Sequence, residues 1–248
     1  MNGSLVSTAT RQRVRDLATP VARGLGRLGL TPNALTLIGF LGTCVAAVAA
    51  AWQAWLAAGV LVLVFGIFDL FDGALARATG RATKLGAFLD STFDRAGEAI
   101  VSIGIAVGCL TAGFNLGAIL AASAMAAAFM VSYTRAKSES LGFTTGTGMA
   151  AIGLAPREVR LALLAIGLLA VSIVGPVGPP NLDPSCPGNL LASCMAPAFY
   201  RAGDIALGGT LGLIAILATI TTIQRILHVA RAEQPPGRQP EPRQSREG

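Results

Sequence analysis

Long apolar runs alternate with short polar links through most of this chain. Crossing a bilayer as an α-helix takes about 20 predominantly apolar residues. Six runs approach or reach that length, at about 35–52, 56–77, 85–109, 116–135, 160–174 and 205–227. The pattern therefore predicts an all-α integral membrane protein with six transmembrane helices.

A different periodicity precedes the first run. Between Ala9 and Leu30, apolar residues recur every three or four positions among five arginines. That spacing is typical of an amphipathic helix that lies in the membrane interface. We expect this juxtamembrane helix within a cytoplasmic segment at 1–32, followed by the six-helix domain at 33–230.

The two ends of the chain carry no long apolar run. The first 16 residues lack the apolar core of a signal peptide, so we expect the N-terminus to be retained. Residues 231–248 are rich in Pro, Gln and Arg, a composition that predicts a disordered cytoplasmic tail.

Composition agrees with a membrane protein, and the charges indicate its orientation. Charged residues make up only 13% of the chain, against about 25% in a soluble domain. Of the 19 Lys and Arg residues, only Arg201 falls in a loop on the side opposite the N-terminus. The positive-inside rule then places both termini, and the site between them, on the cytoplasmic side of the cell membrane. The net charge of +6 comes from residues at helix ends, so we expect anionic lipid headgroups and not nucleic acid as partners.

The four cysteines fall into two pairs. Cys44 and Cys109 lie within predicted spans and are expected to be small packing residues. Cys186 and Cys194 share the long external loop, where a disulfide is allowed if the outside is oxidising. The sequence leaves both the linked and the free state open.

Four aspartates interrupt the second and third apolar runs, at Asp69, Asp72, Asp90 and Asp94. Residues three or four positions apart share one face of a helix, so each pair points one way. The two runs are joined by the short link ATGRATK, which makes them antiparallel neighbours and can bring both pairs together. Four carboxylates this close cannot all stay ionised unaided, so either protons or cations must neutralise them.

Two divalent cations would balance four carboxylates. An all-oxygen donor set suits Mg²⁺ or Mn²⁺, and the only histidine, His228, lies beyond the last run. Two ions about 3.5–4 Å apart are a known arrangement for phosphoryl transfer. Charge alone leaves two other interpretations open: an ion or proton pathway, as in an ion-coupled transporter, and structural salt bridges. The nearby cations for such bridges are Arg77, Arg81, Lys84 and Arg95.

The spacing of the polar residues narrows this choice. From Asp69 the chain reads D-x2-D-G-x2-A-R-x8-G-x3-D-x3-D, filled by Asp69, Asp72, Gly73, Ala76, Arg77, Gly86, Asp90 and Asp94. At all eight positions the pattern resembles the signature of the CDP-alcohol phosphotransferase family. The resemblance implies a membrane enzyme with that family's six-helix fold, CDP-diacylglycerol as the donor and a homodimeric assembly.

The resemblance also implies roles for the matched residues. Two Mg²⁺ or Mn²⁺ ions would bind at the four aspartates, and Asp94 would also be the base that activates the acceptor hydroxyl. Small residues would let the nucleotide approach the helix backbone, and Arg77 would meet its phosphates. The residues expected to bind the CDP-lipid are Asn33, Thr36, Asp72, Gly73, Ala76, Arg77, Thr83 and Gly86.

Segments on either side of the signature resemble an actinobacterial branch of this family whose acceptor is inositol 1-phosphate. They imply an acceptor-phosphate site made of Arg135, Lys137, Arg157, Arg160 and Arg225. Three of these arginines, at 135, 160 and 225, lie at cytoplasmic helix ends and can converge on one doubly charged phosphate. Glycerol 3-phosphate carries the same phosphate group and stays open as the alternative acceptor.

Overall fold

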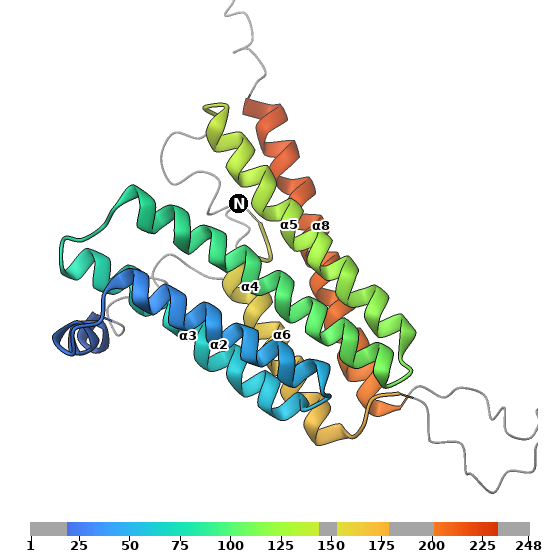
Figure 1. Ribbon diagram of the computed structural model, residues 1–248. Coiled ribbons are helices and arrows are strands. Elements are labelled where there is room, and N and C mark those ends of the chain that lie inside the picture. Colours follow the sequence, from blue (N-terminus) through green and yellow to red (C-terminus); the bar gives the residue numbers. More distant parts are fainter. Residues whose placement is uncertain (1–18, 144–152, 179–200, 233–248) are drawn as a thin grey trace, which may run out of the picture.

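The computed structural model describes residues 19–143, 153–178 and 201–232, with the side chains of residues 69 and 70 excepted. Within these ranges the chain forms only helices and connecting turns, which confirms the all-α prediction. Residues 19–27 are helical and precede the long helices. The long helices are α2 (Pro32–Ala51), α3 (Trp55–Ala78), α4 (Lys84–Thr111), α5 (Asn115–Ser140), α6 (Arg157–Val174) and α8 (Ala202–Ala232) (Figure 1).

Short turns reverse the chain between the first four long helices. Two of these helices start on a threonine cap: the Thr31 hydroxyl accepts from the Ala34 N–H at 3.2 Å, and the Thr83 hydroxyl accepts from the Gly86 N–H at 3.0 Å. Such caps satisfy backbone donors that a helix start leaves unpaired. Gly80, with φ +66°, provides the left-handed turn between α3 and α4. The starts of α2, α4 and α6 and the ends of α3, α5 and α8 therefore lie at one end of the bundle, here called the polar end (Figure 1).

The long helices form a closed ring. Among the described residues, the helices that pack along one another are α2 with α3, α3 with α6, α6 with α8, α8 with α5, α5 with α4, and α4 with α2. The close pairing of α5 with α8 is plain in Figure 1. In this ring order α4 and α6 stand opposite each other. Side chains that join α4 to α6 must consequently cross the interior of the ring.

Small residues allow the helix backbones to approach closely. A Cβ added at Gly104 or Gly108 of α4 would lie 2.2 Å from the carbonyl oxygen of Ala47 or Ala50 on α2. Contacts this close are typical of membrane helix pairs, which associate through small residues. At the polar end, Ala22 of the 19–27 helix packs in a smaller buried cluster with Leu35 and Leu75.

The outer surface of the bundle is apolar, as expected for helices in lipid. Large apolar side chains such as Leu41, Val45, Ile119 and Ile216 are more than half exposed. Of the described helices, α2, α3, α5 and α8 are long and apolar enough to cross a membrane. The two other long helices, α4 and α6, carry the charged residues described below. An all-helical fold with four candidate membrane spans is thus confirmed, and the count of six spans stays a prediction.

Several sequence-based expectations lie outside the described residues. They include the Cys186–Cys194 link, the start of the amphipathic segment at 9–18 and the tail from residue 233. The predicted start of the disordered tail at residue 231 is wrong, because Arg231 and Ala232 are the last residues of α8. Cys44 of α2 is half-buried, Cys109 of α4 is buried, and both are free thiols within helices, in agreement with packing roles.

Candidate active site

The signature aspartates come from the last turns of α3 and the first half of α4. Asp72 is buried, with 4% of its surface exposed, and its Oδ2 accepts a hydrogen bond from the Thr36 hydroxyl of α2 at 2.6 Å. Hydrogen bonds to a carboxylate are short and strong, so this contact fixes the Asp72 side chain against α2. Asp69 lies one turn earlier on α3, and its side chain is outside the described part of the structure.

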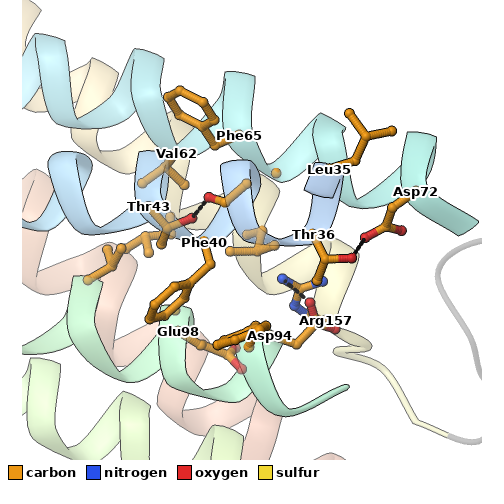
Figure 2. A pocket seen from close by; sticks show the side chains of 17 residues that line it. Leu35, Thr36, Phe40, Thr43, Val62, Phe65, Asp72, Asp94, Glu98 and Arg157 are labelled. Atoms are coloured by element: carbon orange, nitrogen blue, oxygen red, sulfur yellow. Dashed lines mark hydrogen bonds and ion pairs between the residues drawn. The ribbon is translucent and has the colours of Figure 1, made fainter. Parts of the chain in front are cut away.

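A cavity of about 40 Å³, here called the narrow cavity, connects two of the aspartates inside the ring. Its lining includes Asp72 of α3, Asp94 and Glu98 of α4, and Arg157 of α6. Figure 2 shows Thr36 beside Asp72 at one end and Arg157 reaching toward Asp94. The Nη2 of Arg157 lies 2.8 Å from Asp94 Oδ1. The narrow cavity therefore places the last signature aspartate beside a cation from the opposite helix.

A second cavity, of about 200 Å³, opens on the other side of Asp72, and we call it the signature cavity. It also has Asp90 in its lining. All eight residues expected to bind the CDP-lipid line it, namely Asn33, Thr36, Asp72, Gly73, Ala76, Arg77, Thr83 and Gly86. The structure thus brings together residues from α2, α3, α4 and the link before α4, as the sequence-based hypothesis requires.

Two glycines keep space for polar groups around the signature cavity. A Cβ added at Gly86 would lie 3.1 Å from Thr83 Oγ1 and 3.2 Å from Asn33 Oδ1. A Cβ added at Gly73 would lie 3.2 Å from Nη1 of Arg77. Any larger side chain at either position would push these polar groups away or enter the cavity itself. Both glycines therefore act on the shape of the cavity.

A third cavity, of about 430 Å³, lies between α3, α4, α5, α6 and α8, and we call it the arginine cavity. It shares Asp94 and Arg157 with the narrow cavity. Five guanidinium groups line the arginine cavity, those of Arg95, Arg135, Arg157, Arg160 and Arg225. Its acidic lining residues are Asp94 and Glu158. The net positive lining suits a multiply charged anion.

Four of the five residues expected at the acceptor phosphate line the arginine cavity; the fifth, Lys137, is exposed and outside its lining. Arg135 is half-exposed and its Nε lies 2.8 Å from Glu139 Oε1. Arg225 is buried, and its Nη1 donates to the carbonyl of Val131 on α5. The guanidinium groups thus reach the cavity while already in contact with protein groups.

Glu98 is a site residue that the sequence reasoning missed. It is 9% exposed, lies one turn after Asp94 on α4, and forms a 2.7 Å ion pair with Arg160 of α6. The i+4 spacing from Asp94 was a usable signal, because it places a further carboxylate on the face that carries the signature aspartates. The signature ends at Asp94, and so attention to the motif alone passed over Glu98.

The donor chemistry at the aspartates fits a hard divalent cation. Asp72 and Asp90 share the signature cavity, and carboxylate oxygens are ligands that Mg²⁺ and Mn²⁺ prefer. Among the side chains that the structure describes, no three His, Cys, Asp or Glu residues gather closely enough to hold a metal ion. The Asp69 carboxylate is not among those side chains.

The fold and the site agree with a comparison against known families. Residues 29–178 match the family model described as CDP-alcohol phosphatidyltransferase. The chain belongs to this family. The matched range contains the signature, all eight residues of the predicted CDP-lipid site and both ion pairs between α4 and α6.

Relatives within the family carry names that refer to inositol phosphate lipids. The chain is 40% identical over 159 residues to the archaetidylinositol phosphate synthase of Pyrococcus horikoshii, covering 64% of this chain and 80% of the relative. It is 33% identical over 215 residues to the phosphatidylinositol phosphate synthase of Cutibacterium acnes, covering 86% and 92%. These relatives support the branch of the family that the sequence indicated.

Solved structures of a related enzyme share the fold. The phosphatidylinositol phosphate synthase of Mycobacterium tuberculosis with CDP-DAG bound is 26% identical, with a TM-score of 0.67, covering 89% of this chain and 98% of that one. The same enzyme in complex with manganese and citrate has a TM-score of 0.66, covering 88% and 93%.

Proposed function

We propose that this protein transfers the phosphatidyl group of CDP-diacylglycerol to a hydroxyl of inositol 1-phosphate, with phosphatidylinositol phosphate and CMP as products. One observation carries the proposal. The narrow cavity shares Asp72 with the signature cavity and Asp94 with the arginine cavity. A nucleotide site and an anion site are thereby linked through the carboxylates that the reaction needs.

The signature cavity is the proposed site for the CDP group of the donor. Arg77 provides a cation for the diphosphate, and Gly73 and Gly86 leave room for the nucleotide beside the helix backbone. The bound CDP-DAG in the related mycobacterial enzyme supports this assignment. The acyl chains would extend into the lipid that surrounds the apolar outer face of the bundle.

The four signature aspartates are the proposed ligands of two Mg²⁺ or Mn²⁺ ions. Such ions would balance the carboxylates and stabilise negative charge on the phosphoryl oxygens during transfer. The manganese in a structure of the mycobacterial relative supports a divalent cation. In this chain, Asp72 and Asp90 line the signature cavity, and Asp94 lines the narrow cavity and the arginine cavity.

The chemical step is a displacement at the phosphorus that carries the lipid. The acceptor hydroxyl oxygen forms a new bond to this phosphorus. At the same time, the bond between the phosphorus and the bridging oxygen of CMP breaks. CMP leaves with the electron pair, and the hydroxyl proton passes to the Asp94 carboxylate, the proposed general base. Arg157, at 2.8 Å from Asp94 Oδ1, helps to orient that carboxylate.

The arginine cavity is the proposed site for the acceptor phosphate. Arg135, Arg157 and Arg225 line it from three different helices, and guanidinium groups bind phosphate oxygens well. An acceptor without a phosphate group, such as serine or free inositol, would not need this number of cations. The names of the relatives favour inositol 1-phosphate over glycerol 3-phosphate.

We further propose the membrane arrangement that accompanies this reaction. All six long helices span the cell membrane, and the amphipathic helix lies in its cytoplasmic interface. The polar end then faces the cytoplasm, where a soluble phosphorylated acceptor can reach the arginine cavity. Support comes from the gathering of site charges at that end of the bundle. A homodimer, as the family resemblance implies, is part of the same proposal.

A CMP-release assay tests the function. Purified protein with CDP-diacylglycerol and Mg²⁺ or Mn²⁺ is offered inositol 1-phosphate, glycerol 3-phosphate, free inositol and serine in parallel. We expect CMP release with inositol 1-phosphate only. Preference for glycerol 3-phosphate would reassign the acceptor within the family, and preference for serine would show that the arginine cavity has another use. Ion or solute uptake into proteoliposomes without CMP release would instead favour a transporter.

A further inference from the structure

Two ion pairs cross the interior of the ring, one helical turn apart. Asp94 pairs with Arg157, and Glu98 pairs with Arg160. Both carboxylates belong to α4 and both arginines to α6, and these helices stand opposite each other in the ring. The spacing of four residues on α4 and three on α6 stacks the second pair one turn deeper than the first. The deeper pair has no role in the reaction as described so far.

The deeper pair is the more buried and the more completely bonded. Arg160 is 2% exposed and Glu98 is 9% exposed. The Nε of Arg160 donates to Glu98 Oε1 at 2.8 Å, and its Nη2 donates to Oε2 at 3.0 Å. Two parallel bonds between a guanidinium fork and a carboxylate fix the orientation of both groups. The geometry sets the separation between α4 and α6 at this level.

Arg160 also holds the turn that leads into α6. Its Nη1 donates to the carbonyl of Ala155 at 2.9 Å. The N–H of Ala155 in turn donates to the Thr221 hydroxyl of α8 at 3.0 Å. The first turn of α6, which carries Arg157, is therefore tied to α4 through Glu98 and to α8 through Thr221.

All three nitrogens of Arg160 have protein partners, and its charge faces the Glu98 carboxylate. A guanidinium carries five N–H donors in fixed directions, so bonds from all three nitrogens leave little capacity for a phosphate. A phosphate that bound here would have to displace a buried carboxylate, which leaves Glu98 as an uncompensated buried charge. These contacts argue against a direct grip of Arg160 on the acceptor.

We propose that Glu98 and Arg160 are positioning residues for the transfer reaction. Their ion pair fixes the first turn of α6 relative to α4 and thereby places Arg157 against the Asp94 carboxylate. This inference rests on the proposed function, because it assigns the pair a role in acceptor activation at Asp94. It differs from the sequence-based expectation that Arg160 binds the acceptor phosphate itself.

The two readings predict opposite effects of neutralising Glu98. If the pair positions Arg157 and Asp94, Glu98→Gln lowers kcat at saturating concentrations of both substrates by roughly 100-fold, the loss typical of a small misplacement near the chemistry. The KM for CDP-diacylglycerol stays within about twofold of the wild-type value, because neither Glu98 nor Arg160 lines the signature cavity. If Arg160 instead binds the phosphate, Glu98→Gln removes a competing anion, and the acceptor KM falls while kcat is unchanged.

Arg160→Lys provides the second arm. Lysine keeps the positive charge but cannot form the two-pronged bond to Glu98 and the bond to Ala155 together. If Arg160 is a positioning residue, the fall in kcat should be similar to that of Glu98→Gln. If Arg160 binds the acceptor phosphate directly, kcat should be nearly normal. Arg231→Lys is the matched control, since it makes the same change at an exposed arginine of α8 that lines none of the three cavities. Its loss of kcat should be clearly smaller.

Folding and function are controlled separately. Each variant is compared with the wild type by gel filtration and by its affinity for CDP-diacylglycerol. If a single variant fails to fold, it is replaced by the double variant Glu98→Gln/Arg160→Gln, which leaves no unpaired buried charge. A reduced kcat of the double variant supports the positioning role, and a wild-type kcat overturns that role. A wild type that releases no CMP would refute the proposed function, whereas an active wild type with a lower acceptor KM for Glu98→Gln would refute only this inference.

Discussion

The signature cavity and the arginine cavity differ in how the protein builds them. The signature cavity is lined by residues 32–90, on neighbouring helices, and glycines determine its shape. The arginine cavity is lined by residues 62–225 of five helices, and cations determine its character. The first therefore recognises a ligand mainly by the space that it leaves, the second mainly by charge. Substitutions in the two regions should affect different kinetic constants.

Asp94 lines the arginine cavity and also the narrow cavity, which it shares with Asp72. Its loss should have the largest effect. Asp94→Asn keeps the size of the side chain but removes the proposed base and a proposed metal ligand. We expect turnover to fall by roughly 10²–10⁴-fold, the contribution typical of a general base. Binding of CDP-diacylglycerol should persist, because the eight residues expected to bind the CDP-lipid are unchanged. CMP release and donor binding measured on the same sample check this; full turnover would remove Asp94 from the mechanism.

Arg225 tests the arginine cavity alone. Arg225→Gln removes a buried cation from a site for a phosphate dianion, a loss that typically costs about 2–5 kcal/mol. We expect the KM for inositol 1-phosphate to rise by roughly 30-fold or more, with the donor KM unchanged. Arg231→Gln is the matched control, because it changes an exposed arginine of the same helix α8. Equal effects of the two changes would show that Arg225 acts only through the general charge of the helix end.

The sequence predicted the signature cavity well and the arginine cavity less well, for a physical reason. Helical periodicity and a short link are enough to bring Asp72, Gly86 and Asp90 together, because α3 and α4 are consecutive neighbours. The partners of an arginine across the ring depend on how nonconsecutive helices pack, and no local pattern contains that information. The bond from Arg160 to Glu98 and the exposed position of Lys137 are both of this kind.

Gly86 tests the signature cavity alone. Gly86→Leu adds a side chain whose first carbon already lies 3.1 Å from Thr83 Oγ1, so the rest of it must occupy the cavity. We expect the KM for CDP-diacylglycerol to rise at least about tenfold, since even one misplaced methylene costs 10–200-fold in a fitted pocket. The acceptor KM should not change. Gly209→Leu is the control, because a Cβ at Gly209 meets nothing within 4 Å; a similar loss in both variants would exclude a specific role for Gly86.

Substitution of Lys137 tests whether this charge contacts the acceptor phosphate directly or only attracts the acceptor over a distance. Its side chain is exposed and outside the lining of the arginine cavity, so water and salt screen it in a way that they do not screen buried Arg225. We expect Lys137→Gln to lower kcat/KM for inositol 1-phosphate by less than about fivefold at low salt, as for other exposed charges. The difference from wild type should disappear near 0.5 M salt, whereas the defect of Arg225→Gln should persist. Kinetics of both variants over a salt series measure this. A loss for Lys137→Gln that is large and independent of salt would place Lys137 in direct contact with the phosphate, and the arginine cavity would then have to close around its acceptor by moving the end of α5.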